Sequence, residues 1–94
     1  MSTYILLGTL TEGGADKLRS RPSWVDEMKR DLENMGVQVL AQYAVLGPYD
    51  IVTLVEAPNN KAIVRVSALL TLKGSIKITT LPALPIEEFI TTLT

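Results

Sequence analysis

The chain has 94 residues and contains neither cysteine nor histidine. Without cysteine it cannot form disulfides, thiolate nucleophiles or the cysteine ligand sets of zinc and iron–sulfur centres. Without histidine it lacks the usual base at physiological pH and the commonest metal ligand. Serine triads, zinc hydrolases and histidine-ligated haem are therefore excluded.

Acidic residues are present, but their spacing does not match the loop of a calcium site. We therefore expect a protein without a metal and without a cofactor. The acidic residues considered for such a site are Asp16, Asp26, Glu27, Asp31 and Glu33.

The chain also lacks an excess of charge of one sign. The chain has 9 lysines and arginines and 10 aspartates and glutamates, so its net charge is -1. No run of like charge exceeds two residues. A nucleic acid or an anionic membrane surface would have little to attract it, so neither is expected as a partner. The sequence shows no signal-peptide pattern and no apolar run of the roughly 20 residues that a membrane-spanning helix needs. We therefore expect a soluble cytoplasmic protein.

The length suits one domain over residues 1–94, because a chain of this size buries a single core. Hydrophobic residues make up 47% of the sequence and charged residues only 20%. This apolar share is high for so small a domain, so some apolar surface is expected to face a partner.

The pattern along the chain predicts alternating strands and helices. Glycines, prolines and asparagines mark the breaks between them, with Gly13–Gly14 as a turn, Gly36 as a helix stop and Asn59 or Asn60 as a helix cap. The predicted strands are Thr3–Leu10, Val37–Leu46, Ile51–Ala57 and Ser75–Leu81, and the predicted helices are Ala15–Arg19, Pro22–Met35, the segment from Asn60 to Lys73, and Ile86–Leu93.

The order of the main elements is strand, helix, strand, strand, helix, strand. The short link between the two central strands predicts an antiparallel hairpin. The simplest arrangement is an α+β, ferredoxin-like βαββαβ fold, with a four-stranded antiparallel sheet and both long helices on one face.

Such a sheet would be apolar on both faces, although helices cover only one. We therefore expect a homo-oligomer, a dimer or larger, that forms through the uncovered face. The alternative is that the terminal helix Ile86–Leu93 folds back over that face as a lid. One apolar set includes Tyr4, Leu6, Leu10, Leu40, Ala44, Leu46, Val52 and Leu54, and the other includes Ile5, Leu7, Val39, Val45 and Ile51.

Several short motifs, in matching order over nearly the whole chain, resemble the GYD-domain family of small bacterial proteins. This resemblance implies a ferredoxin-like protein related to the dimeric α+β barrels, and it supplies no catalytic residues. The motifs are Leu10–Thr11 with Gly14, Gly47-x-Tyr49–Asp50, Glu56–Ala57–Pro58, Thr80–Leu81 with Ala83, and Glu88–Phe89.

Five residues are candidates for a ligand site: Tyr49, Asp50, Tyr4, Trp24 and Tyr43. Tyr49 and Asp50 would place a phenol and a carboxylate at a cleft between sheet and helix, where they could bind a polar ligand or assist proton transfer. The structural alternative is that Asp50 bonds the amides of its own turn. The other three aromatic residues suit a core or an interface as well as a pocket lining.

Arg19 and Arg21, beside Pro22, could clamp an anion or could simply be solvated.

Two functions remain open. One is a non-catalytic module that binds a small molecule or a partner protein. The other is a cofactor-independent oxygenase or isomerase of the dimeric α+β barrel type. This second hypothesis rests on the analogy of fold alone.

Overall fold

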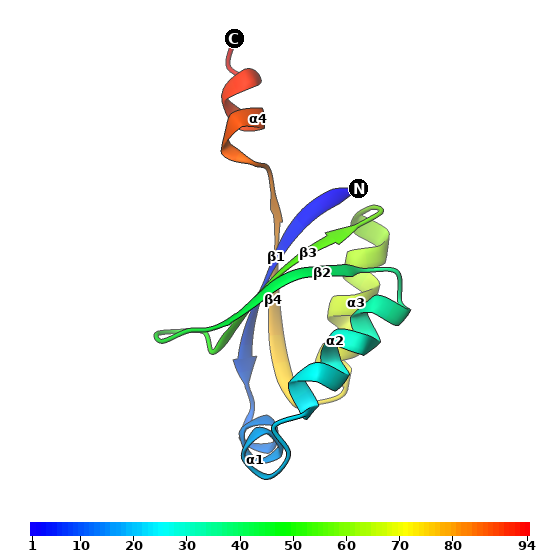
Figure 1. Ribbon diagram of the computed structural model, residues 1–94, viewed down its shortest axis with the longest axis vertical. Helices are drawn as coiled ribbons and strands as arrows, with labels where there is room; N and C mark the ends of the chain where they lie inside the picture. Colours follow the sequence, from blue (N-terminus) through cyan, green and yellow to red (C-terminus); the bar gives the residue numbers. More distant parts are fainter.

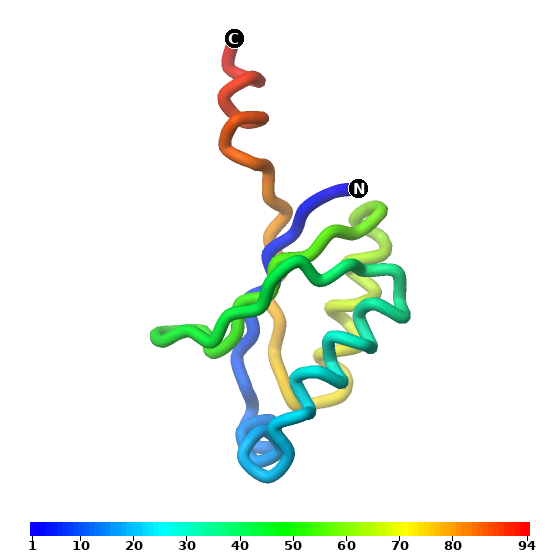
Figure 2. The backbone as a smooth tube through the Cα atoms, in the orientation of Figure 1, coloured from blue at the N-terminus to red at the C-terminus, as the bar shows by residue number.

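A computed structural model describes residues 1–94 (Figures 1 and 2). It confirms the α+β class and contains four strands and four helices. The elements in chain order are β1 Ser2–Leu10, α1 Glu12–Ser20, α2 Trp24–Asn34, β2 Gln38–Ala44, β3 Ile51–Ala57, α3 Asn60–Leu72, β4 Ile76–Ala83 and α4 Ile86–Thr91.

The four strands form one sheet in the order β2-β3-β1-β4, and every neighbouring pair is antiparallel. Helices α2 and α3 both cover the same face of the sheet, as Figure 1 shows, with α2 over β2 and α3 over β4. The ferredoxin-like arrangement expected from the sequence is therefore confirmed for the sheet and its two long helices.

The ends of the two long helices follow from local residues. Asn59 caps α3, because its side-chain oxygen accepts the Ala62 amide at 3.0 Å. Gly36 and Gly74 follow α2 and α3 with φ angles of 83° and 79°. Glycine adopts this left-handed conformation without steric cost, so both helices stop where the sequence predicts.

Helix α1 begins earlier than expected. The sequence predicts a turn at Gly13–Gly14, but both glycines lie in the first turn of α1, which Thr11 caps by accepting the Gly14 amide at 3.1 Å. A Cβ atom at Gly14 would lie 1.8 Å from the Ser75 carbonyl oxygen. Gly14 therefore serves close packing of α1 on the start of β4 rather than a turn.

Strand β2 contains a bulge at Leu40, where the pairing with β3 shifts between Val39 and Ala41. A bulge adds one residue to a strand, so the residues beyond it change faces. Val39 consequently does not share a face with Ala41 and Tyr43. The strict alternation expected along this strand was wrong for that reason.

The core lies between the sheet and the helices α2 and α3. Trp24, Met28 and Leu32 form the buried stripe of α2, as their helical spacing predicts. Tyr4, at 1% exposure, is among the least exposed residues of the core. The remaining core residues are Leu6, Val37, Ile51, Val55, Ala57, Ile63, Val66, Leu70 and Ile76.

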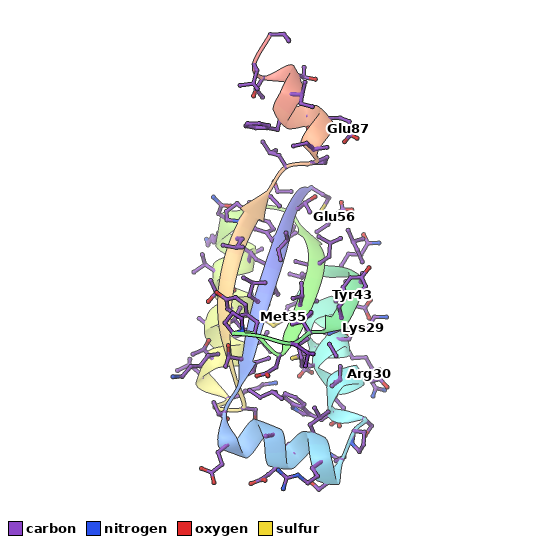
Figure 3. The ribbon with its side chains drawn as sticks, turned by 90° about the vertical axis from the view of Figure 1, so that its left-hand side faces the viewer. Lys29, Arg30, Met35, Tyr43, Glu56 and Glu87 are labelled. Atoms are coloured by element: carbon purple, nitrogen blue, oxygen red, sulfur yellow. The ribbon has the colours of Figure 1, made fainter.

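The opposite face of the sheet, called the open face below, is covered by no helix. Figure 3 looks onto it and shows the strands in front of α2 and α3. Cross-strand pairing places Leu54 and Leu81 on either side of Ile5, so Val52 and Leu54 share a face with Ile5 and Leu7, not with Tyr4 and Leu6. The apolar residues of the open face are Ile5, Leu7, Ala41, Tyr43, Val52, Leu54 and Leu81.

Helix α4 does not fold back as a lid. It stands clear of the body at the end of an extended segment (Figures 1 and 2), and it makes no more than marginal contact with any other element. The molecule is correspondingly long, with extents of 51 × 28 × 18 Å. The lid alternative is thereby contradicted, and the open face stays uncovered within one chain.

Candidate functional site: the cleft beside the Gly47–Asp50 turn

The Gly47–Asp50 turn joins β2 to β3 and also fastens this hairpin to β1. Gly47 has a φ of 113°, a conformation that disfavours any side chain. The Asp50 amide donates to the Gly8 carbonyl at 2.8 Å, and the Asp50 carbonyl accepts the Val45 amide at 3.0 Å. The backbone of Asp50 therefore bonds both to β1 and to the residue that follows β2.

The Asp50 carboxylate extends this connection. Its Oδ2 atom accepts the backbone amide of Leu10 at 2.8 Å, so the carboxylate continues the bonding of the hairpin to β1 beyond Gly8. The expected partners were amides of the turn itself. The observed amide lies 40 residues away, and the bond stabilises tertiary structure rather than the local turn.

A cleft of about 390 Å³ lies beside Asp50, between the helices α1 and α2 and the strand β2. Its walls are mostly apolar, and Asp50 and Gln42 supply the polar side chains. Gln42 is itself engaged, since its amide nitrogen donates to the Thr53 hydroxyl at 3.4 Å. The lining residues are Leu10, Leu18, Val25, Gln42, Tyr43, Ala44, Asp50 and Ile51.

This cleft can accept an apolar group and one hydrogen-bond donor. The Asp50 carboxylate keeps one oxygen beyond the bond to Leu10. Tyr43 and Ala44 at its edge are exposed, with Tyr43 at 61%, so solvent reaches the cleft. Such an open site suits binding better than a reaction that must exclude water.

The five candidate residues do not converge on one site. Asp50 and Tyr43 line the cleft, and the half-buried Tyr49 precedes Asp50 but is not among the lining residues. Tyr4 lies in the core, where its hydroxyl donates to the Asn60 side chain. Trp24 lies in the core beneath a second, smaller pocket.

That second pocket, of about 160 Å³, lies where α1, α2 and the end of α3 meet. Its rim carries charged side chains of both signs, most of them already paired. Arg21 contacts Glu27 at 3.5 Å, and Lys73 contacts Asp31 at 2.8 Å. Arg19 pairs with Asp16 at 3.3 Å, so the two arginines considered as an anion clamp each face a carboxylate instead.

The cleft residues Leu10, Leu18, Val25 and Gln42 were not predicted for a site. The apolar ones look like core residues in the sequence, and only the position of α1 brings Leu18 beside Asp50. No signal in the sequence marks them, because the bulge that turns the polar Gln42 toward the helices leaves no trace in the alternation of β2.

Two general features complete the description. No group of three or more histidine, cysteine, aspartate or glutamate side chains is arranged to hold a metal ion. None of the helices combines the length and the apolar character needed to cross a bilayer.

Comparison with known proteins gives the family. The model of the GYD domain matches residues 4–93, which is nearly the whole chain. The chain belongs to the GYD-domain family. The resemblance expected from the sequence motifs is thereby confirmed.

Two proteins of Thermus thermophilus are similar to this GYD-domain chain. One is 45% identical over 94 residues, which cover 99% of both chains, and is named "Glutamine synthetase and cystathionine beta-lyase binding protein". The other is TTHA0845, whose crystal structure matches with a TM-score of 0.60 and 24% identity, covering 90% of this chain and 95% of that one. The second similarity supports the ferredoxin-like fold.

Proposed function

We propose that this protein is a non-catalytic, homo-oligomeric module that binds other proteins. The observation that carries the proposal is the open face, an apolar sheet surface left uncovered by every helix of its own chain. Large uncovered apolar surfaces on soluble proteins mark sites of protein association. The relative named as a binding protein for two enzymes supports the same interpretation.

The open face suits contact with a second copy of the chain. Ile5 and Leu7 lie at its centre, flanked by residues of β3 and β4, and polar residues such as Glu56 and Lys77 lie toward its edges. An apolar centre with a polar rim is the usual composition of a protein interface. Two such faces packed together would form a sheet-on-sheet core, as in a dimeric α+β barrel.

The partner proteins are proposed from the relative. Glutamine synthetase and cystathionine β-lyase are the enzymes in its name, so the same two enzymes from this protein's own organism are the first partners to test. The test is biolayer interferometry with each purified enzyme on the sensor. Saturable binding of this protein to at least one enzyme, and none to an unrelated oligomeric enzyme, is the expected result. The absence of binding to either enzyme with this protein at about 100 µM, one hundred times a Kd of about 1 µM, would contradict the proposed partners.

The cleft supports a second candidate, the binding of a small apolar molecule that carries a hydrogen-bond donor. The enzymatic form of this candidate is a cofactor-independent oxygenase or isomerase in which Asp50 accepts a proton. Native mass spectrometry of the purified protein would detect a bound molecule. Val25→Phe, which fills the cleft, should remove the extra mass, while Val64→Phe on the exposed side of α3 should keep it. A protein that never carries or takes up a ligand would contradict this candidate.

A further inference from the structure

The C-terminal arm, residues 84–94, carries an apolar stripe with nothing to pack on. The stripe residues recur at spacings of three and four, which places them on one side of α4 and of the turn that follows it, and all are exposed. A helix of six residues is not stable in water without such packing. The arm therefore needs a surface that its own chain does not provide; the stripe is Ile86, Phe89, Ile90 and Leu93.

Helix α3 has an unpartnered outer side as well. Its inner side packs Ile63, Val66 and Leu70 into the core, yet Val64 and Leu72 on the outer side are 64% and 80% exposed. A helix that is apolar on both sides is normally buried on both sides. An apolar groove of about 450 Å³ runs along this outer side, lined by Val64, Ser67, Ala68, Thr71, Leu72 and Thr80.

The charges of the two helices are complementary. Helix α4 carries two carboxylates, Glu87 and Glu88, and no cation, and in Figure 3 the labelled Glu87 lies well clear of the sheet. Helix α3 carries two cations, Lys61 and Arg65, and no acidic residue. None of these four side chains forms an ion pair within the chain. Opposite charges of this kind favour one orientation of docking.

The exposed area of the chain is larger than a compact monomer of its size requires. A globular protein of 10.3 kDa exposes about 5,350 Å², whereas this chain exposes 6148 Å². The excess of about 800 Å² is comparable in size to what one partner buries in an interface of standard size. The radius of gyration, 14.0 Å against about 12.4 Å for a compact chain, shows the same extension.

We infer that the C-terminal arm of one copy packs into the α3 groove of a second copy, with Glu87 and Glu88 beside Lys61 and Arg65. This is recognition of an amphipathic helix by an apolar groove. Because both copies carry both surfaces, the exchange is reciprocal in a two-fold pair. The residues differ from those of the open face, so this contact adds to the association proposed there and can fail independently of it.

The absence of native cysteine allows a direct test by disulfide cross-linking. One chain carries Phe89→Cys in the arm. The other chain carries Ala68→Cys, which places a thiol in the groove, and a tag that changes its size. The two chains are mixed under mild oxidation. A mixed disulfide of the two chains is expected. The matched control is Lys29→Cys on the exposed side of α2, which should give at least tenfold less mixed product.

Three outcomes would overturn the inference: no mixed product, equal product with the Lys29→Cys control, or preferential reaction of the arm thiol with Leu7→Cys on the open face.

Charge variants give a second readout. Arg65→Glu should lower the cross-linking yield, and Glu88→Lys in the arm should restore it. Leu54→Asp on the open face should leave the yield unchanged, which separates failure of the arm contact from failure of the open-face contact.

Discussion

The carboxylate of Asp50 makes a contact whose removal tests how the family motif stabilises the fold. Asp50→Ala leaves the Leu10 amide without the partner that it has at 2.8 Å. A hydrogen bond to a charged group contributes about 1.5–3 kcal/mol to stability. Because Leu10 and Asp50 are half-buried, water replaces part of the lost bond in the variant. We expect a loss of about 1–2 kcal/mol in the free energy of unfolding. Asp50→Asn keeps an acceptor oxygen and should lose less than about 1 kcal/mol.

Urea denaturation at one fixed protein concentration measures these differences, because self-association makes the midpoint concentration-dependent. In thermal melts the alanine variant should unfold about 4–16 °C below the wild type. Asp16→Ala is the control, since it removes an exposed carboxylate paired only with Arg19, and it should change stability by less than about 0.5 kcal/mol. An Asp50→Ala protein as stable as the wild type would refute the structural role and make Asp50 a residue kept for ligand binding or proton transfer.

Substitutions at three further positions test the packing around the sheet by the same denaturation assay. Gly14→Ala should cost at least about 1–3 kcal/mol, because the new Cβ atom meets the Ser75 carbonyl oxygen, and wild-type stability would refute that contact. Asn59→Ala should cost about 1 kcal/mol through loss of the α3 cap, whereas Asn59→Asp should cost little. Tyr4→Phe should cost about 0.5–1.5 kcal/mol through loss of the hydroxyl bond to Asn60, and a neutral result would show that this bond does not stabilise the fold.

Local signals predicted most of the fold. Strand β3 covers Ile51–Ala57, the same residues that the sequence indicates, because a turn and a proline bound a continuous β-forming run. Asn59, Gly36 and Gly74 likewise act within a few residues of their own positions. Caps and stops of this kind need no knowledge of the rest of the chain.

The features that were missed depend on distant parts of the chain. The glycine at position 14 looks like a turn residue until Ser75, far along the sequence, is seen to pack against it. The bulge at Leu40 arises from pairing with β3 and leaves no mark in the alternation of β2 itself. The sequence also could not place the C-terminal arm, because no surface of its own chain holds it.

The candidate site was predicted only in part, for the same reason. The motif drew attention to Asp50, which does line the cleft, but its bond to Leu10 crosses 40 residues. Aromatic side chains were weak guides, since Tyr4 and Trp24 are almost fully buried in the core and only Tyr43 reaches the cleft. Large aromatic residues serve cores and pockets alike, so their type alone cannot separate the two.

Multi-angle light scattering tests the central proposal, that the open face is a contact between copies. The wild type should have at least twice the 10.3 kDa mass of one chain at micromolar concentration. Leu54→Asp, which places a carboxylate in the middle of the open face, should lower the measured mass. Asn34→Asp, which adds the same charge at the exposed end of α2, should leave it unchanged. A monomeric wild type, or a Leu54→Asp protein with the mass of the wild type, would contradict the proposal.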